Sequence, residues 1–208
     1  MELPVKATGV PQPFVEEGIG MDAWQAIETR RTIRRYRQQP IPQEMVVRIV
    51  NAGRLAASAG NAQPIRFVIV NEPSLLPEVF STLAWLRAAG DPPEGQRPVA
   101  YVAVLGDTTI SGSYQSDAAA ACQNMQTAAW AEGIGSCWIG SVNRPKLKGL
   151  LGLPDNLEIY AVISLGYPAE TAVAEDDPET TSARRRADGV LRVPKRPLAQ
   201  VLRFNRWG

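Results

Sequence analysis

Five arginines fall within eight residues in the stretch 30-RRTIRRYR-37, which also carries the hydroxyl of Thr32. Guanidinium groups and a hydroxyl are typical donors for a phosphate, to which arginine forms charge-assisted and often bidentate hydrogen bonds. If a helix ran through the stretch, like charges would face each other four residues apart, and a bound anion would relieve their repulsion. The stretch therefore predicts an anion site, with a solvated face paired to nearby acids as the alternative.

Three further stretches could contact a ligand. The small and polar 58-SAGNAQP-64 would allow close approach of backbone to a flat molecule, although most such loops are only turns. The stretch 133-GIGSCWIGS-141 contains G-x-G, but it follows a helical segment and enters a strand-like one. That order is the reverse of a dinucleotide-binding fingerprint, so a Rossmann site is excluded. The ending 195-KRPLAQVLRFNRWG-208 alone predicts a basic surface.

The chain contains no histidine. A Ser-His-Asp relay, a Cys-His relay and an H-E-x-x-H zinc site all need imidazole, so these classes of site are excluded. The two cysteines, Cys122 and Cys137, are interpreted as packed thiols and cannot form a structural zinc site alone. No metal site is predicted, and an enzyme with this composition would rely on a carboxylate, a lysine or a bound cofactor.

Length and charge set further bounds. The chain has 208 residues, with 22 Lys plus Arg against 21 Asp plus Glu, so it lacks the basic excess of a protein that tracks a phosphate backbone. No apolar run is long enough to span a membrane, and the N-terminal stretch has no signal-like apolar segment. We expect a cytoplasmic protein without membrane contact, with an irregular arm over residues 1–20 and one domain over residues 21–208.

The elements that must position these stretches follow from apolar periodicity and capping residues. Helices are expected at 21–29, 41–57, 73–87, 116–133 and 143–151. Asp22 is a candidate cap of the first of these helices, and Ser116 or Asp117 of the fourth. Strands are expected at 67–71, 99–107, 136–140 and 158–168. Residues 170–189 are expected to form an exposed loop, and a short strand, a short helix and an aromatic tail should follow. Because no regular βαβ rhythm occurs, we predict an α+β fold with a mixed sheet covered by helices.

Taken in order, five motifs resemble the nitroreductase family of FMN-dependent NAD(P)H oxidoreductases. They are 30-RRTIRRY-36, 58-SAGNAQP-64, 133-GIGSCWIG-140, 166-GYP-168 and 195-KRPL-198. The resemblance covers nearly the whole chain. It implies a mainly antiparallel sheet flanked by helices in an intertwined homodimer, with FMN at the interface and terminal segments that embrace the partner.

The resemblance also implies three sets of FMN-binding residues. The phosphate set would hold the phosphate and the pyrimidine edge of the ring: Arg30, Arg31, Thr32 and Arg34, with Lys195 and the adjacent Arg196. The partner set would reach the flavin from the other subunit: Ser58, Ala59, Gly60 and Asn61. The ring set would lie along the flavin, with a backbone N–H near N5: Trp138, Ile139, Gly140 and Ser141. No catalytic side chain is implied, because the flavin carries the chemistry.

Three departures from the family pattern concern the pocket. Thr32 replaces a serine and keeps the hydroxyl, Lys195 replaces an arginine, and Ile65 and Arg66 stand where many members have tryptophan and a polar residue. The implied reaction is hydride transfer from NADH or NADPH to FMN, followed by reduction of a small acceptor such as a nitroaromatic or a quinone. Neither the preferred nicotinamide nor the acceptor is specified by the sequence.

Two alternatives stay open. A non-catalytic flavin- or nucleotide-binding dimer would use the same phosphate-binding arginines. A nucleic-acid-binding dimer would use the arginine stretch together with 184-RRR-186, and its affinity would fall steeply with salt. The balanced overall charge counts against the second alternative, so we expect no nucleic-acid partner.

Overall fold

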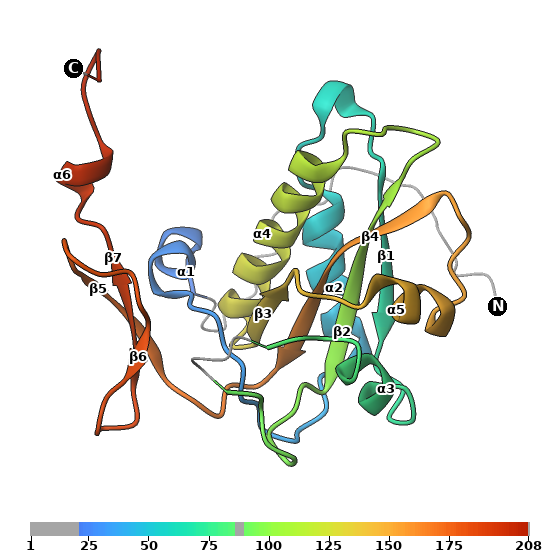
Figure 1. Ribbon diagram of the computed structural model, residues 1–208, viewed down its shortest axis with the longest axis horizontal. Helices are drawn as coiled ribbons and strands as arrows, with labels where there is room; N and C mark the ends of the chain where they lie inside the picture. The colour runs from blue at the N-terminus through green and yellow to red at the C-terminus, as the bar shows by residue number, and fades with distance from the viewer. Residues whose placement is uncertain (1–20, 86–89, 208) are drawn as a thin grey trace.

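The computed structural model describes residues 21–85 and 90–207 (Figure 1). The predicted arm over residues 1–20 lies outside these ranges. The main sheet has the strand order β1-β2-β4-β3, and every neighbouring pair in it is antiparallel. Its strands are β1 Ile65–Val70, β2 Ala100–Asp107, β4 Leu157–Gly166 and β3 Gly135–Ile139. The two central strands are almost wholly buried, which explains their continuous apolar sequences.

Helices cover both faces of this sheet. On one face α2 and α4 enclose a core that includes Ile49, Met125 and Ile163. On the other face α3 and α5 enclose a second core around Val79, Tyr101 and Leu147. The helices are α1 Ala23–Thr29, α2 Gln43–Arg54, α3 Leu76–Phe80, α4 Gln115–Ala131, α5 Arg144–Leu150 and α6 Leu198–Val201, with a 3-10 helix η1 at Ala59–Asn61. The predicted α+β class with a mainly antiparallel sheet flanked by helices is confirmed.

A second, three-stranded sheet lies beside the main body, with the order β5-β7-β6 (Figure 1). Its strands are β5 Ala172–Asp176, β7 Leu191–Lys195 and β6 Arg184–Arg185; β5 and β7 are parallel, and β6 and β7 are antiparallel. The prediction of an exposed loop over residues 170–189 is therefore wrong for β5 and β6, whereas residues 177–183 and 186–189 form mostly exposed loops as predicted. β5 and β6 are short, and each pairs with β7, which lies further along the chain.

Several helix ends differ from the sequence prediction; α2, for example, is Gln43–Arg54 where 41–57 was expected. Of the helix expected over 73–87, the structure describes residues 73–85, in which α3 is short and a turn follows it at 81–82; residues 86 and 87 lie outside the described ranges. The N-cap of α4 is Tyr114, so Ser116 and Asp117 lie inside the first turn. Asp22 caps α1 as predicted, accepting a hydrogen bond from the Gln25 N–H at 2.8 Å. Gly133 ends α4 with a φ of 72°, a conformation that glycine adopts without a Cβ clash.

Candidate functional site

The arginine segment, residues 30–37, is extended rather than helical. α1 ends at Thr29, and the chain then runs beside β3, where the Ile33 N–H donates to the Ser136 carbonyl at 2.9 Å. Ile33 and Tyr36 are fully buried, and the Tyr36 hydroxyl shares a hydrogen bond of 2.8 Å with Ser164 Oγ. These two buried side chains fix the segment against the sheet, so its arginines are placed by core packing.

Two glycines make this approach possible. A Cβ at Gly135 would lie 2.8 Å from Ile33 Cβ, and a Cβ at Gly166 would lie 2.6 Å from Tyr36 Cδ1. Both distances are shorter than side-chain contacts allow, so any larger residue would push the arginine segment away from β3 and β4. Neither glycine was predicted to have a packing role, although Gly135 lies in 133-GIGSCWIG-140 and Gly166 in 166-GYP-168.

A buried carboxylate holds the backbone of the same segment. Glu170, whose side chain is 4% exposed, accepts the N–H of Arg34 at 2.6 Å and the N–H of Arg35 at 3.1 Å. Its other oxygen pairs with Arg185 of β6 at 2.5 Å. Glu170 thus joins the arginine segment to the three-stranded sheet. Sequence reasoning missed this residue, because nothing in its local pattern shows a contact more than a hundred positions away.

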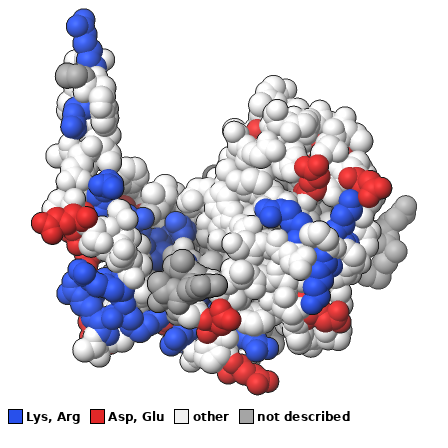
Figure 2. Space-filling view, in the orientation of Figure 1, with Lys and Arg blue, Asp and Glu red and all other residues white. Residues whose placement is uncertain are grey.

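The structure brings most of the phosphate set together. A cavity of about 130 Å³ opens between the arginine segment and the three-stranded sheet. Its polar lining comes from five of the predicted residues, namely Arg30, Arg31, Thr32, Arg34 and Lys195. Arg196 does not line the cavity and is exposed. Figure 2 shows Lys and Arg side chains gathered over the three-stranded sheet and the adjoining hollow of the surface.

The electrostatics of this cavity favour an anion. Burial, and secondly the neighbouring Arg31, lower the pKa of the Arg30 guanidinium, and burial lowers the pKa of Arg31. Among the described residues, the buried Nε atoms of both arginines have no hydrogen-bond partner, and no carboxylate forms an ion pair with either. Unpaired buried donors carry a desolvation cost that a bound anion would remove.

The second arginine run, 184-RRR-186, is engaged differently. Each of its three guanidinium groups forms an ion pair with a carboxylate: Arg184 with Asp177 at 3.8 Å, Arg185 with Glu170 at 2.5 Å and Arg186 with Glu175 at 2.9 Å. These cations are neutralised within their own sheet and by Glu170. The pairing supports a structural role for this run and weakens the nucleic-acid alternative that depended on it.

The partner set lies far from the phosphate set on the same chain. Ala59 of η1 donates its N–H to Asp117 Oδ1, at the start of α4, at 3.1 Å. At the other end of α4, Trp130 Nε1 donates to Thr29 Oγ1 at 2.9 Å, directly before the arginine segment. These two ends of the helix are roughly 20 Å apart at 1.5 Å per residue. One chain therefore does not bring the two sets to one ligand phosphate.

The backbone of η1 is unusual. Gly60 and Asn61 have φ values of 57° and 54°, and Gln63 also has a φ of 54°. Such left-handed residues outside glycine are uncommon and concentrate at ligand sites. All three are exposed. Next to the start of α4, the loop therefore exposes the amide side chains of Asn61 and Gln63 and the backbone around them.

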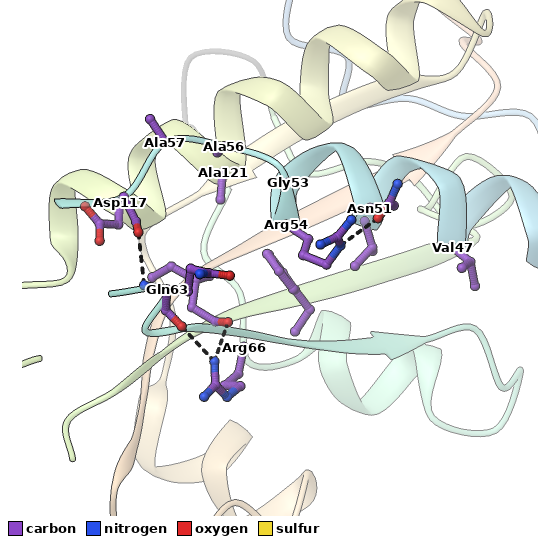
Figure 3. A pocket seen from close by; sticks show the side chains of 14 residues that line it. Val47, Asn51, Gly53, Arg54, Ala56, Ala57, Gln63, Arg66, Asp117 and Ala121 are labelled. Atoms are coloured by element: carbon purple, nitrogen blue, oxygen red, sulfur yellow. Dashed lines mark hydrogen bonds between the residues drawn. The ribbon is translucent and has the colours of Figure 1, made fainter. Parts of the chain in front are cut away.

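A larger pocket of about 520 Å³ lies beside this loop, between α2, the start of α4 and β1 (Figure 3). Of the partner set only Ser58 lines it; Ala59, Gly60 and Asn61 do not. Figure 3 shows Gln63 and Asp117 at one end of the pocket and Val47 of α2 at the other. Arg54, which also lines it, bonds to Asn51 Oδ1 at 2.7 Å.

The ring set stands at the end of β3, an edge strand that pairs only with β4 in the main sheet. Trp138 packs on Tyr160 with 5.9 Å between ring centroids, and Ile139 is buried. Gly140 and Ser141 are exposed. Thr32 lies opposite Ser136 near the start of β3, so the phosphate and ring sets lie along one strand of one chain, with Gly140 about 13 Å from Ser136 at 3.3 Å per residue.

Several other chemistries find no support in the described part of the chain. Burial raises the pKa of the Cys122 thiol to about 12 and that of Cys137 to about 11, so both are protonated and poor nucleophiles at neutral pH. Within residues 21–85 and 90–207, no group of three His, Cys, Asp or Glu side chains could hold a metal ion. No helix in these ranges is long and apolar enough to cross a bilayer.

Comparison with known proteins is consistent with this geometry. The model of the Nitroreductase family matches residues 27–108 and 112–167. A relative from Archaeoglobus fulgidus, which carries the provisional name NADH dehydrogenase/NAD(P)H nitroreductase, is 34% identical over 152 residues, covering 69% of this chain and 84% of the relative. An NADH dehydrogenase from Thermus thermophilus is 30% identical over 188 residues, covering 72% of this chain and 88% of the relative.

A solved structure shows the same fold. The crystal structure of a Desulfovibrio desulfuricans protein in complex with FMN superposes with a TM-score of 0.64 at 26% identity, covering 89% of this chain and 98% of that one. The family model accounts for the arginine segment, both central strands and the end of β3 in a single match. From these matches and the fold, we conclude that the chain belongs to the nitroreductase family.

Proposed function

We propose that the protein is an FMN-dependent oxidoreductase that takes hydride from NADH or NADPH and reduces a small acceptor such as a nitroaromatic or a quinone. Membership of the nitroreductase family supports an oxidoreductase. The observation that carries the finer proposal is the cavity in which Arg30 and Arg31 present buried donors without partners. The FMN in a structural neighbour supports the identity of the cofactor.

The donor set fits a phosphate group. The cavity, at about 130 Å³, is smaller than the 300 Å³ and more that a whole drug-sized ligand occupies, so it suits the terminal phosphate of a longer molecule. Arg30, Arg31 and Lys195 would supply its positive charge, and Thr32 a hydroxyl donor. Arg196, exposed beside the cavity, would contribute at longer range. The charges would be better balanced with the anion than without it.

The rest of FMN would extend along β3 toward the ring set. When bound, the flavin supplies hydride acceptance and electron delivery in two half-reactions. Arg34 would face its pyrimidine edge, where a fixed positive charge stabilises negative charge that develops on reduction. The exposed backbone at Gly140 and Ser141 would lie beside the ring. Protons would come from solvent, so this chemistry needs no histidine.

A homodimer would complete the site. Because the partner set lies roughly 20 Å along α4 from the phosphate set, we assign Ser58, Ala59, Gly60 and Asn61 to a second copy. Figure 1 shows the C-terminal segment extending away from the main body. It carries large exposed apolar side chains, at Leu198, Val201, Leu202, Phe204 and Trp207. A partner subunit would cover such a surface.

The first experiment is an absorption spectrum of freshly purified protein, followed by heating and identification of the released chromophore. Close to one FMN per chain is the expected result. A colourless protein that also fails to take up added FMN would overturn the proposal. Steady-state NAD(P)H oxidation with a nitroaromatic or quinone then separates an enzyme from a non-catalytic flavin-binding dimer, which would bind FMN without turnover.

Mixed dimers test the shared site. One chain would carry Arg31→Met and the other Asn61→Ala, each with its own affinity tag so that heterodimers can be isolated. If each site uses both chains, one site of the heterodimer holds both substitutions and the other holds neither. We expect the heterodimer to regain about half of the wild-type activity per dimer. Activity no higher than that of the two homodimeric variants would contradict the shared site.

A further inference from the structure

Unpaired buried polar atoms gather in a second place, away from the arginine segment. Arg97 Nε and the Tyr101 hydroxyl are both buried, and neither has a hydrogen-bond partner among the described residues. Both residues line one cavity of about 200 Å³. It lies on the α3 side of the main sheet, and none of the residues that line the arginine cavity takes part in it.

The walls of this cavity are mostly apolar. α3 contributes Leu76, Pro77 and Phe80, and two more prolines, Pro73 and Pro98, close the sides. Gln38 and Glu94 also line it, and both are exposed to solvent, which screens the Glu94 carboxylate. The cavity therefore combines an apolar wall with two polar atoms, Arg97 Nε and the Tyr101 hydroxyl oxygen, that have no hydrogen-bond partner within residues 21–85 and 90–207.

The two polar groups are suited to a carboxylate. Arg97 Cζ lies over the Phe80 ring, 4.3 Å from its centroid, which holds the guanidinium at the apolar wall by a cation–π contact. No carboxylate of the described residues forms an ion pair with Arg97. Tyr101 is 1% exposed, and burial raises the pKa of its hydroxyl, which therefore stays a neutral donor at physiological pH.

We propose that this cavity is a binding site for a small aromatic carboxylate. The carboxylate would accept hydrogen bonds from Arg97 and from Tyr101, which removes the cost of leaving these donors unpaired. The ring would pack against the apolar wall. A dry cavity of about 150 Å³ is known to take benzene, so a cavity of about 200 Å³ has room for a ring with one carboxylate. This site is independent of FMN binding.

Benzoate is the probe for the test, used with the protein as purified. Binding would be measured by titration calorimetry and by the shift of the thermal unfolding midpoint. We expect saturable binding of benzoate and a midpoint that rises with its concentration, because a ligand that binds only the folded state stabilises it. Benzyl alcohol, which has the ring without the carboxylate, should bind at least about tenfold more weakly.

Two variants locate the site. Tyr101→Phe removes only the hydroxyl, so without ligand its unfolding midpoint should equal or exceed that of the wild type. Its affinity for benzoate should nonetheless fall about fivefold to tenfold, and Arg97→Met should abolish the binding. Lys148→Met, at a cation beside a different apolar pocket, is the matched control and should bind as the wild type does. Absence of saturable binding up to millimolar benzoate, or equal affinity in the wild type and both cavity variants, would overturn the proposal.

Discussion

Glu170 accepts the backbone N–H of Arg34 at 2.6 Å, although the two residues are 136 positions apart in the chain. A buried carboxylate next to a proposed phosphate site could act in two opposite ways. Its negative charge would oppose the anion, whereas its hydrogen bonds hold the backbone that carries the arginines. Because Arg185 pairs with the same carboxylate at 2.5 Å, the charge is largely offset, and we expect the positioning effect to dominate.

Replacing Glu170 tests which effect dominates. Glu170→Ala leaves two backbone N–H groups without their acceptor, so we expect FMN affinity to fall about fivefold to tenfold. Glu170→Gln keeps one carbonyl acceptor, so its FMN affinity should lie between that of Glu170→Ala and that of the wild type. Glu175→Ala, which removes a carboxylate from the same sheet, is the control. Tighter FMN binding in both Glu170 variants would show that charge is the larger effect.

The arginines of the segment should separate into two classes. Arg30→Met and Arg31→Met each remove a cavity donor, and a charge-assisted hydrogen bond is worth about 1.5–3 kcal/mol. We expect FMN affinity to fall at least about tenfold in each variant, with a weaker dependence on salt. Arg35→Met is the matched control, since Arg35 lies in the same stretch but does not line the cavity. Equal losses in all three variants would mean that the charge of the stretch matters and the cavity does not.

Arg30→Met and Arg31→Met should not destabilise the FMN-free protein. Arg30 and Arg31 are partly buried beside each other, and both have an unpartnered Nε. In the FMN-free protein we expect either substitution to leave the free energy of unfolding unchanged or to increase it, because a repulsion and an unpaired donor are removed. Urea unfolding of FMN-free samples measures this. Destabilisation of both variants would contradict the view that the anion site is strained without its ligand.

Some strands and most of the phosphate set could be predicted from the sequence. Continuous apolar runs were enough to predict β2 and β4, because strands buried on both faces leave that pattern. The phosphate set was predicted from residue types and family motifs, and all of it except Arg196 meets in one cavity. Each of these patterns lies within a short stretch of consecutive residues, and it could therefore be recognised without knowledge of the fold.

Contacts between distant positions were not predictable in this way. Glu170 looks like an ordinary surface acid in sequence, and only the fold brings it under the backbone of Arg34. β5 and β6 were interpreted as parts of one loop, because an acidic patch and the run 184-RRR-186 dominate residues 170–189, and each strand forms only by pairing with β7. Asp117 was interpreted as a cap of α4, yet its carboxylate accepts the Ala59 N–H from another element.

The stability of the protein should weaken in acid partly through Asp107. Hydrogen bonds from Thr109 and Asn156 lower the pKa of this carboxyl, with Arg66 at 3.5 Å adding a smaller effect. A carboxyl with a folded-state pKa below its unfolded value near 3.9 stabilises the fold above that value. This contribution is lost as pH falls through the folded-state pKa. The unfolding midpoint of Asp107→Asn should therefore lie below that of the wild type at pH 6, and the gap should close toward pH 2. A gap that does not depend on pH would assign the effect to lost hydrogen bonds alone.

The close approach of the arginine segment to the sheet should depend on Gly166. A Cβ at this position would lie 2.6 Å from the ring of Tyr36, a fully buried side chain that also bonds to Ser164. The Tyr36 ring cannot move away from this Cβ unless the arginine segment moves with it. Gly166→Ala should therefore lower the free energy of unfolding, measured in urea, by about 1–3 kcal/mol. Gly112→Ala is the matched control, because a Cβ there meets no atom within 4 Å and its φ is not in the left-handed region. Since the displaced segment carries Arg30 and Arg31, Gly166→Ala should also weaken FMN binding in protein that is still folded. Loss of stability with unchanged FMN affinity would show that the core absorbs the strain and that the arginine cavity does not depend on this contact.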